Sequence, residues 1–189
     1  MRFFQIAWEN RYNSDVGNDC IISVDCTDCK FCIDKGKSKK SVKKAFWSYK
    51  FRKSGLRYEV GVCIKTGYIV WIHGPFPCGR YNDVTIFRHC LLFCLDQGER
   101  VECDDGYFGE APEKCVVPKH AWARQSHLVP NSGAVRARHE TINKRIKDFE
   151  CMKQFFRQSI EFHSVCFRAV AVLTQLSMEN GKPAFQVEY

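Results

Sequence analysis

The sequence lacks any apolar run near the ~18 residues that a membrane-spanning helix needs. Its first residues, MRFFQIAWENR, are apolar only briefly before charged residues appear, which excludes a typical secretory signal peptide. It also has no internal repeat, and no low-complexity linker apart from one short basic run. These absences disfavour membrane, secreted and repeat proteins, and a soluble, intracellular protein with one domain over residues 1–189 is the default expectation.

The composition favours a globular protein with a polyanionic partner. The chain has 189 residues, of which 45% are hydrophobic and 26% charged, enough to bury a sizeable core. Its net charge is +8, and the basic residues cluster in two runs, 35–44 (KGKSKKSVKK) and 136–147 (RARHETINKRIK). Such runs are often only solvated surfaces, but two of them beside acids in apolar surroundings favour a nucleic acid.

The 12 cysteines invite a disulfide framework, which the missing secretion signal makes unfavourable. Most lie in apolar segments and are expected to be reduced core thiols. In the stretch SVDCTDCKFC, however, Cys26, Cys29 and Cys32 are closely spaced. A structural zinc site needs four ligands, and a fourth would have to come from His73 or Cys78 through folding. A zinc-binding interaction module stays open as an alternative, and an iron–sulfur cluster is less favoured.

The hydrophobic pattern predicts a mixed α/β or α+β fold in which strands come first and helices follow. Residues 21–33 are expected to form two short strands joined by a turn, and 74–79 (GPFPCG) a loop because of its two prolines. Other strands are expected at 46–51, 56–63, 68–73, 101–103 and 115–117. Helices are expected at 83–95, 135–149 and 164–178, the last ended by Asn180-Gly181.

Three carboxylates stand out against this pattern. Asp25 follows the apolar stretch IISV and Asp104 follows VEC, so both are expected at strand ends, where burial of a carboxylate is costly. Glu140 lies on a basic helical stretch, where an ion pair with Lys144 is the ordinary alternative. If the three converge, their oxygens could hold two hard divalent cations, Mg²⁺ or Mn²⁺, for phosphodiester chemistry.

The order of motifs resembles the catalytic domain of DDE-superfamily endonucleases, the group of Harbinger-type transposases and transposase-derived nucleases. Each motif alone is weak, but the five in this order are fairly specific and cover nearly the whole chain. The five are SVDCT (23–27), GPFPCGRYNDVTIFR (74–88), CDDGYFG (103–109), RARHETINKRIKDF (136–149) and FRAVAVLTQL (167–176).

The resemblance implies a ribonuclease H-like fold, with a central mixed sheet flanked by helices, and a catalytic, metal-binding triad of Asp25, Asp104 and Glu140. The first two acids would lie on strands and the third on a helix. Asp83 would be an accessory acid, although Asn82 stands where the family often has histidine. The DNA backbone contacts expected on the basic helix are Arg136, Arg138, Lys144 and Arg145.

The resemblance also bears on partners and location. It implies a two-metal DNA endonuclease or transposase, and a nuclear location if the source is eukaryotic. Only 24 residues precede Asp25, too few for the helical DNA-recognition module of such transposases, so a separate protein is expected to recognise the DNA unless the chain is a fragment or a decaying copy. An oligomer is possible. A catalytically inactive DNA- or protein-binding relative is the alternative function.

Overall fold

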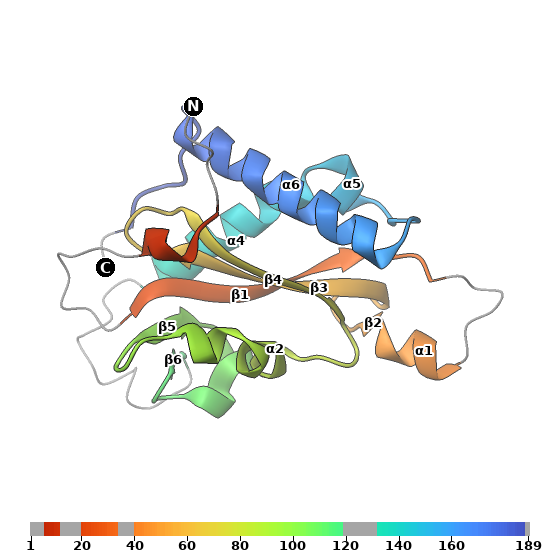
Figure 1. The fold of residues 1–189 in the computed structure, drawn as a ribbon, viewed down its shortest axis with the longest axis horizontal. Coiled ribbons are helices and arrows are strands. Elements are labelled where there is room, and N and C mark those ends of the chain that lie inside the picture. The colour runs from red at the N-terminus through yellow and green to blue at the C-terminus, as the bar shows by residue number, and fades with distance from the viewer. Residues whose placement is uncertain (1–5, 12–19, 34–39, 119–131, 188–189) are drawn as a thin grey trace.

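The computed structural model describes residues 6–11, 20–33, 40–118 and 132–187. A six-stranded sheet forms the middle of the molecule, and helices cover both of its faces (Figure 1). No helix among the described residues is long and apolar enough to cross a membrane. The basic run at 35–44 lies partly outside the described residues, and its last part belongs to α1, Lys40–Ala45.

The sheet is mixed. Its strands are β1 (Cys20–Lys30), β2 (Trp47–Ser48), β3 (Lys53–Cys63), β4 (Ile69–Pro77), β5 (Arg100–Cys103) and β6 (Cys115–Val116). They are ordered β2-β3-β1-β5-β6, and β4 also pairs with β3. β1 is antiparallel to β3 on one side and parallel to β5 on the other. This confirms the prediction of a mixed α/β fold with a central sheet.

The helices divide between the two faces of the sheet, as Figure 1 shows. One face carries the helices α4 (Ser132–Lys147), α5 (Glu150–Lys153) and α6 (Ile160–Glu179). The other carries α2 (Asp83–His89) and the 3₁₀ helices η2 (Leu91–Cys94) and η3 (Asp105–Glu110). A further 3₁₀ helix, η1 (Trp8–Arg11), precedes β1.

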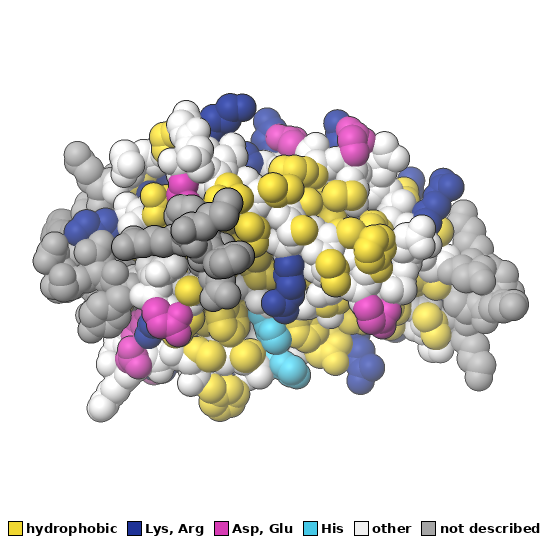
Figure 2. Space-filling model, turned by 45° about the horizontal axis from the view of Figure 1, so that its top comes forward, with side chains coloured by type: hydrophobic (Ala, Val, Ile, Leu, Met, Phe, Trp, Pro, Cys, Tyr) yellow, Lys and Arg dark blue, Asp and Glu magenta, His cyan; other side chains and the backbone are white. Residues whose placement is uncertain are grey.

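The two larger hydrophobic clusters among the described residues lie one on each face, and a third, small cluster includes Cys20 and Val135. Beneath α4 and α6 the rings of Tyr58 and Phe167 stack with centroids 3.7 Å apart, and the Tyr58 hydroxyl lies 2.7 Å from Nδ1 of His163. Beneath α2 the core includes Val24, Cys26 and other apolar side chains. The outer face of α6 is partly apolar, and Figure 2 shows hydrophobic side chains gathered across this side of the molecule; Phe162, Val165 and Leu173 are each about half exposed or more.

Three sequence predictions of secondary structure are wrong. Residues 21–30 form one strand without a turn, because β1 pairs with β3 without interruption from Ile22 to Lys30. The segment 74–77 is not a loop but the end of β4. Its prolines are tolerated because, among the described residues, β4 pairs only with β3, and an edge strand can lack N–H donors on its outer side. The helix expected at 83–95 is broken at Cys90 into α2 and η2.

The remaining elements differ mainly in length. The strand expected at 46–51 shrinks to β2, whereas α6 begins four residues earlier than expected because Ser159 caps it, its Oγ accepting a hydrogen bond from the Phe162 N–H at 3.1 Å. The helix ends at Glu179, before Asn180-Gly181, as the sequence predicts.

Candidate active site

The candidate site lies at the point where β5 ends beside β1. The two strands run parallel, and Val24 pairs with Cys103, the last residue of β5. Asp25 and Asp104 are therefore the next residues on neighbouring parallel strands. Asp104 follows the end of β5 as predicted, but the prediction that Asp25 ends a strand is wrong, because β1 continues along β3 to Lys30. Beyond this point β1 continues to Lys30 without β5 beside it, which leaves an open edge next to the two acids.

Asp25 is half-buried and held from above by α4. The Asn143 side chain donates a hydrogen bond from Nδ2 to Oδ2 of Asp25 at 3.0 Å. Burial raises the pKa of Asp25 from 3.8 to about 6; the Lys50 ammonium opposes the rise, and the carboxylates of Asp104 and Asp83 add to it. Negative charge is thus concentrated at this edge of the sheet.

Asp104 caps the 3₁₀ helix that follows β5. Its Oδ1 accepts a hydrogen bond from the Gly106 N–H at 2.8 Å, and the carboxylate is exposed to solvent. The position that a β-carbon at Gly106 would occupy lies 2.9 Å from Oδ1 of Asp104 and 2.8 Å from Oδ2 of Asp83. Only glycine fits between these oxygens, so the Asp-x-Gly sequence brings two carboxylates together.

Asp83, the first residue of α2, is held by an ion-pair network that the sequence analysis did not identify. Arg57 on β3 binds Oδ1 of Asp83 at 2.7 Å and also binds both oxygens of Asp28, at 2.7 and 3.1 Å. Ser48 donates to Asp28 at 2.6 Å. Burial alone would raise the pKa of Asp28, but the hydrogen bonds and charge of Arg57 outweigh it and lower that pKa. The feature of the sequence that could have predicted this network is Asp28, a second aspartate in the apolar strand, three residues after Asp25.

Glu140 lies on α4 one turn before Asn143, and residues three apart share one side of a helix. Glu140 is therefore on the side of α4 from which Asn143 reaches Asp25. Its side chain is exposed. Among the described residues it makes no hydrogen bond or ion pair, and the pair with Lys144 that the sequence left as an alternative does not form.

The arrangement suits a hard divalent cation in part. Asp25, Asp83 and Asp104 supply carboxylate oxygens, the donors that Mg²⁺ and Mn²⁺ prefer, and Asp104 is open to solvent. Within the described ranges, however, no group of three or more His, Cys, Asp or Glu side chains is placed to hold a metal ion. The structure thus brings two acids of the expected triad together and places the third on the adjacent helix face.

The four basic residues expected to contact DNA divide into two pairs. Arg138 is only 1% exposed, and its guanidinium donates to the carbonyl oxygens of Cys63, at 3.2 Å, and Ile64. The expectation that it contacts DNA needs correction, because its donors are committed to the β3–β4 turn. Arg145 donates to two carbonyls of the segment after α6. The other two residues are more accessible to a ligand than Arg138: Arg136 is partly exposed and Lys144 is exposed.

The cysteine alternative is not supported by the geometry. Cys26 lies in the core beneath α2 and Cys29 in the core beneath α4 and α6, on opposite faces of the sheet, while Cys32 is exposed. Burial raises the pKa of the Cys26 and Cys29 thiols, which disfavours the thiolate that zinc requires. All 12 cysteines are free, as expected.

The fold and the site define an α/β domain that gathers carboxylates where β5 ends beside the parallel strand β1. The chain belongs to the DDE superfamily endonucleases, a family that matches residues 24–175. The matched region contains Asp25, Asp104 and Glu140. No curated protein and no solved structure shows significant similarity to the chain.

Proposed function

We propose that this protein is a divalent-metal-dependent DNA endonuclease or transposase that cleaves phosphodiester bonds by a two-metal mechanism on a ribonuclease H-like fold. The observation that carries the proposal is the register of β1 and β5, which places Asp25 and Asp104 side by side at an open sheet edge. The position of Asp25 within β1, of Asp104 directly after the neighbouring parallel strand β5, and of Glu140 on a helix supports the ribonuclease H-like assignment.

The chain's own residues have distinct roles in this proposal. Asp25 and Asp104 would hold the metals, and Glu140 would be the third ligand. When bound, two Mg²⁺ or Mn²⁺ ions would promote attack by water on the phosphorus and stabilise the leaving 3′ oxygen. Asn143 orients the Asp25 carboxylate through the bond at 3.0 Å, and Arg57 fixes Asp83 as an accessory acid beside Asp104.

The proposal includes DNA as substrate, with Arg136 and Lys144 as phosphate contacts, a separate DNA-recognition protein and a nuclear location. The direct test is nicking of supercoiled plasmid by the purified chain with Mg²⁺ or Mn²⁺. Cleavage that disappears when EDTA removes the metal supports the proposal. If the chain nicks no plasmid with either metal, either alone or joined to a DNA-binding domain, the result contradicts the proposal.

Asn143 provides a test of how the acids are positioned. We expect Asn143→Ala to lower the nicking rate about 10- to 100-fold, the usual effect of losing a residue that orients a metal ligand. The Mg²⁺ concentration that gives half the maximal rate should rise as well, which mere loss of stability would not cause. Thr141→Ala, which removes a hydroxyl bonded only to the carbonyl of Ala137 in the same helix, is the control. Unchanged Mg²⁺ dependence in Asn143→Ala would exclude the positioning role.

The raised pKa of Asp25 predicts a pH-dependent response to metal. Because its folded pKa of about 6 exceeds its ordinary 3.8, Asp25 stabilises the metal-free protein fully below about pH 4, and this contribution is lost as pH rises through about 6. Metal binding needs the ionised carboxylate, so Mg²⁺ should raise the melting temperature more at about pH 7.5 than at about pH 5. Melting curves with Mg²⁺ or EDTA measure this, and Asp25→Asn should reduce the difference. An equal shift at both pH values would contradict the assignment.

A further inference from the structure

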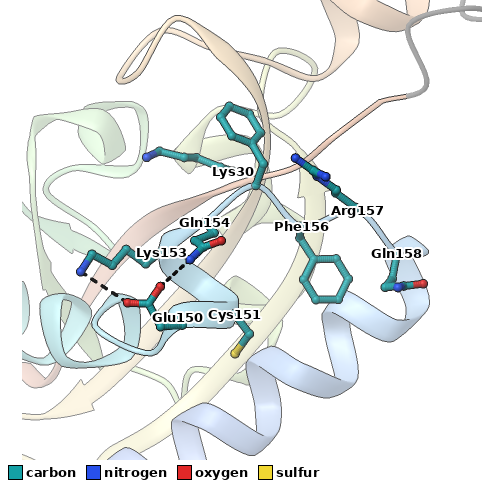
Figure 3. A pocket seen from close by; sticks show the side chains of 9 residues that line it. Lys30, Glu150, Cys151, Lys153, Gln154, Phe156, Arg157 and Gln158 are labelled. Atoms are coloured by element: carbon teal, nitrogen blue, oxygen red, sulfur yellow. Dashed lines mark hydrogen bonds and ion pairs between the residues drawn. The ribbon is translucent and has the colours of Figure 1, made fainter.

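A basic groove lies beside the loop that joins α5 to α6. One cavity of about 750 Å³ is lined by Lys30, Lys153 and Arg157 among others, and Figure 3 shows these side chains around the loop, with Phe156 directed toward α6. A second cavity of about 540 Å³ is lined by Lys43 of α1, by Arg52 and Lys53 of the β2–β3 hairpin, and by apolar side chains that include Trp47. The two cavities share Phe155 and Arg157, and we call them together the basic groove.

Most of the positive charge in the basic groove has no acidic partner among the described residues that line it. The ammonium groups of Lys53 and Lys30 lie 5.2 and 5.9 Å from the centre of the Phe155 ring, which attracts cations without cancelling their charge. Among the described residues that line the groove, Glu150 is the only acid, and its Oε1 lies 3.6 Å from Nζ of Lys153. The groove therefore combines several cationic side chains with the aromatic ring of Phe155.

The groove lies along the same edge of β1 as Asp25, further toward the end of the strand. The α5–α6 loop attaches to this edge: the Phe156 N–H donates to the Lys30 carbonyl at 3.0 Å and the Cys32 N–H to the Phe156 carbonyl at 2.8 Å. The edge is the one opposite β3, because the intervening Phe31 N–H donates to β3 instead. Lys30 lies about 17 Å along the strand from Asp25, at roughly 3.3 Å per residue.

A further cation lies between the acids and the groove. Lys50, in the β2–β3 hairpin, donates from Nζ to the Cys26 carbonyl at 3.1 Å. That carbonyl faces the edge left open where β5 ends. The same hairpin continues into Arg52 and Lys53 of the groove, so positive side chains extend from Asp25 toward Arg157.

We propose that the basic groove binds the phosphate backbone of the DNA that flanks the cleaved bond. The inference rests on the proposed nuclease function, which supplies the polyanion. Phosphates follow one another about 3.4 Å apart along the axis of each duplex strand, so the groove would hold the backbone about five base pairs from the acids. DNA binding needs the positive charge of the groove because α4 supplies less charge than its sequence suggests. The guanidinium groups of Arg138 and Arg145 on that helix donate to the protein's own carbonyl oxygens.

The test measures DNA binding separately from cleavage. Anisotropy of a fluorescent duplex of about 25 base pairs in EDTA is compared for the wild type, Lys30→Ala, Lys53→Ala, Arg157→Ala and the triple variant. Removing one cation that binds a phosphate should lower the slope of log affinity against log salt by about 0.9, and each single variant should bind roughly 3- to 10-fold more weakly at about 0.1 M salt. Lys182→Ala, which removes an exposed lysine beyond the far end of α6, should bind as the wild type does.

The outcomes separate the two proposals. Weaker binding and a smaller salt slope in the groove variants, with unchanged melting temperatures, support the groove whether or not the chain nicks plasmid. Groove variants that match the wild type overturn the groove, while metal-dependent nicking by the same preparations leaves the nuclease intact. A wild-type chain that binds no duplex overturns the groove, and one that also fails to nick plasmid overturns both.

Discussion

Asp25→Asn, Asp104→Asn and Glu140→Gln should each lower metal-dependent plasmid nicking by more than about 100-fold. Loss of a charged metal ligand should exceed the 10- to 100-fold effect typical of the residues that merely orient ligands. The amides preserve shape: an amide oxygen at 104 can still accept the Gly106 N–H, and one at 25 can still accept from Asn143. The expected loss is therefore one of charge rather than of packing.

The loss of activity should not be accompanied by a loss of stability in the metal-free protein. Asp25 is crowded by the carboxylates of Asp83 and Asp104, so Asp25→Asn should leave the metal-free melting temperature unchanged or higher. Asp148→Asn, which alters an exposed carboxylate just after α4, is the matched control and should nick normally. Nicking that survives all three triad substitutions would show that other groups perform the chemistry or that a contaminant does.

Arg57→Met should cost about 3–5 kcal/mol of unfolding free energy, the largest effect on stability that we predict. The substitution removes the cation paired with Asp28, whose side chain is 2% exposed, and leaves this buried charge with the Ser48 hydroxyl but without its arginine. For a domain of this size the melting temperature should fall by about 10 °C. The pKa of Asp28 is lowered by Arg57, so this stabilisation is present near neutral pH and is lost as acid protonates Asp28.

Two comparisons show whether burial is the cause. Arg88→Met removes another arginine–carboxylate pair, with Glu110, but the Arg88 side chain is 50% exposed, so the expected cost is below about 1 kcal/mol. The double variant Asp28→Asn/Arg57→Met should recover part of the loss, because it removes the unpaired charge. Denaturant unfolding measures all four proteins. An equal effect of Arg57→Met and Arg88→Met would contradict the argument.

Residue patterns predicted the mixed fold and the family because they depend on local order. The apolar stretches before Asp25 and Asp104 become β1 and β5, and the final helix ends at its predicted stop signal. The patterns failed where pairing between distant segments decides. Prolines in 74–77 suggest a loop in isolation, yet β3 supplies a partner that holds them in a strand.

Side-chain direction was beyond the sequence for the same reason. Arg138 and Lys144 are both basic residues of one helix, but the packing of α4 on the sheet buries the first and exposes the second. Cys26 and Cys29 are close in sequence but lie on opposite faces of the sheet, because side chains alternate along a strand.

By itself the sequence determined the order of the motifs, the chemical types of the acids and the family to which they belong, since these are properties of the chain read from end to end. Only the tertiary structure decided which charges meet. The parallel register of β1 and β5 brings Asp104 beside Asp25, Arg57 joins Asp28 to Asp83, and Asn143 reaches Asp25 from α4. These contacts join segments far apart in the chain, so they depend on strand pairing and helix packing that no local pattern encodes.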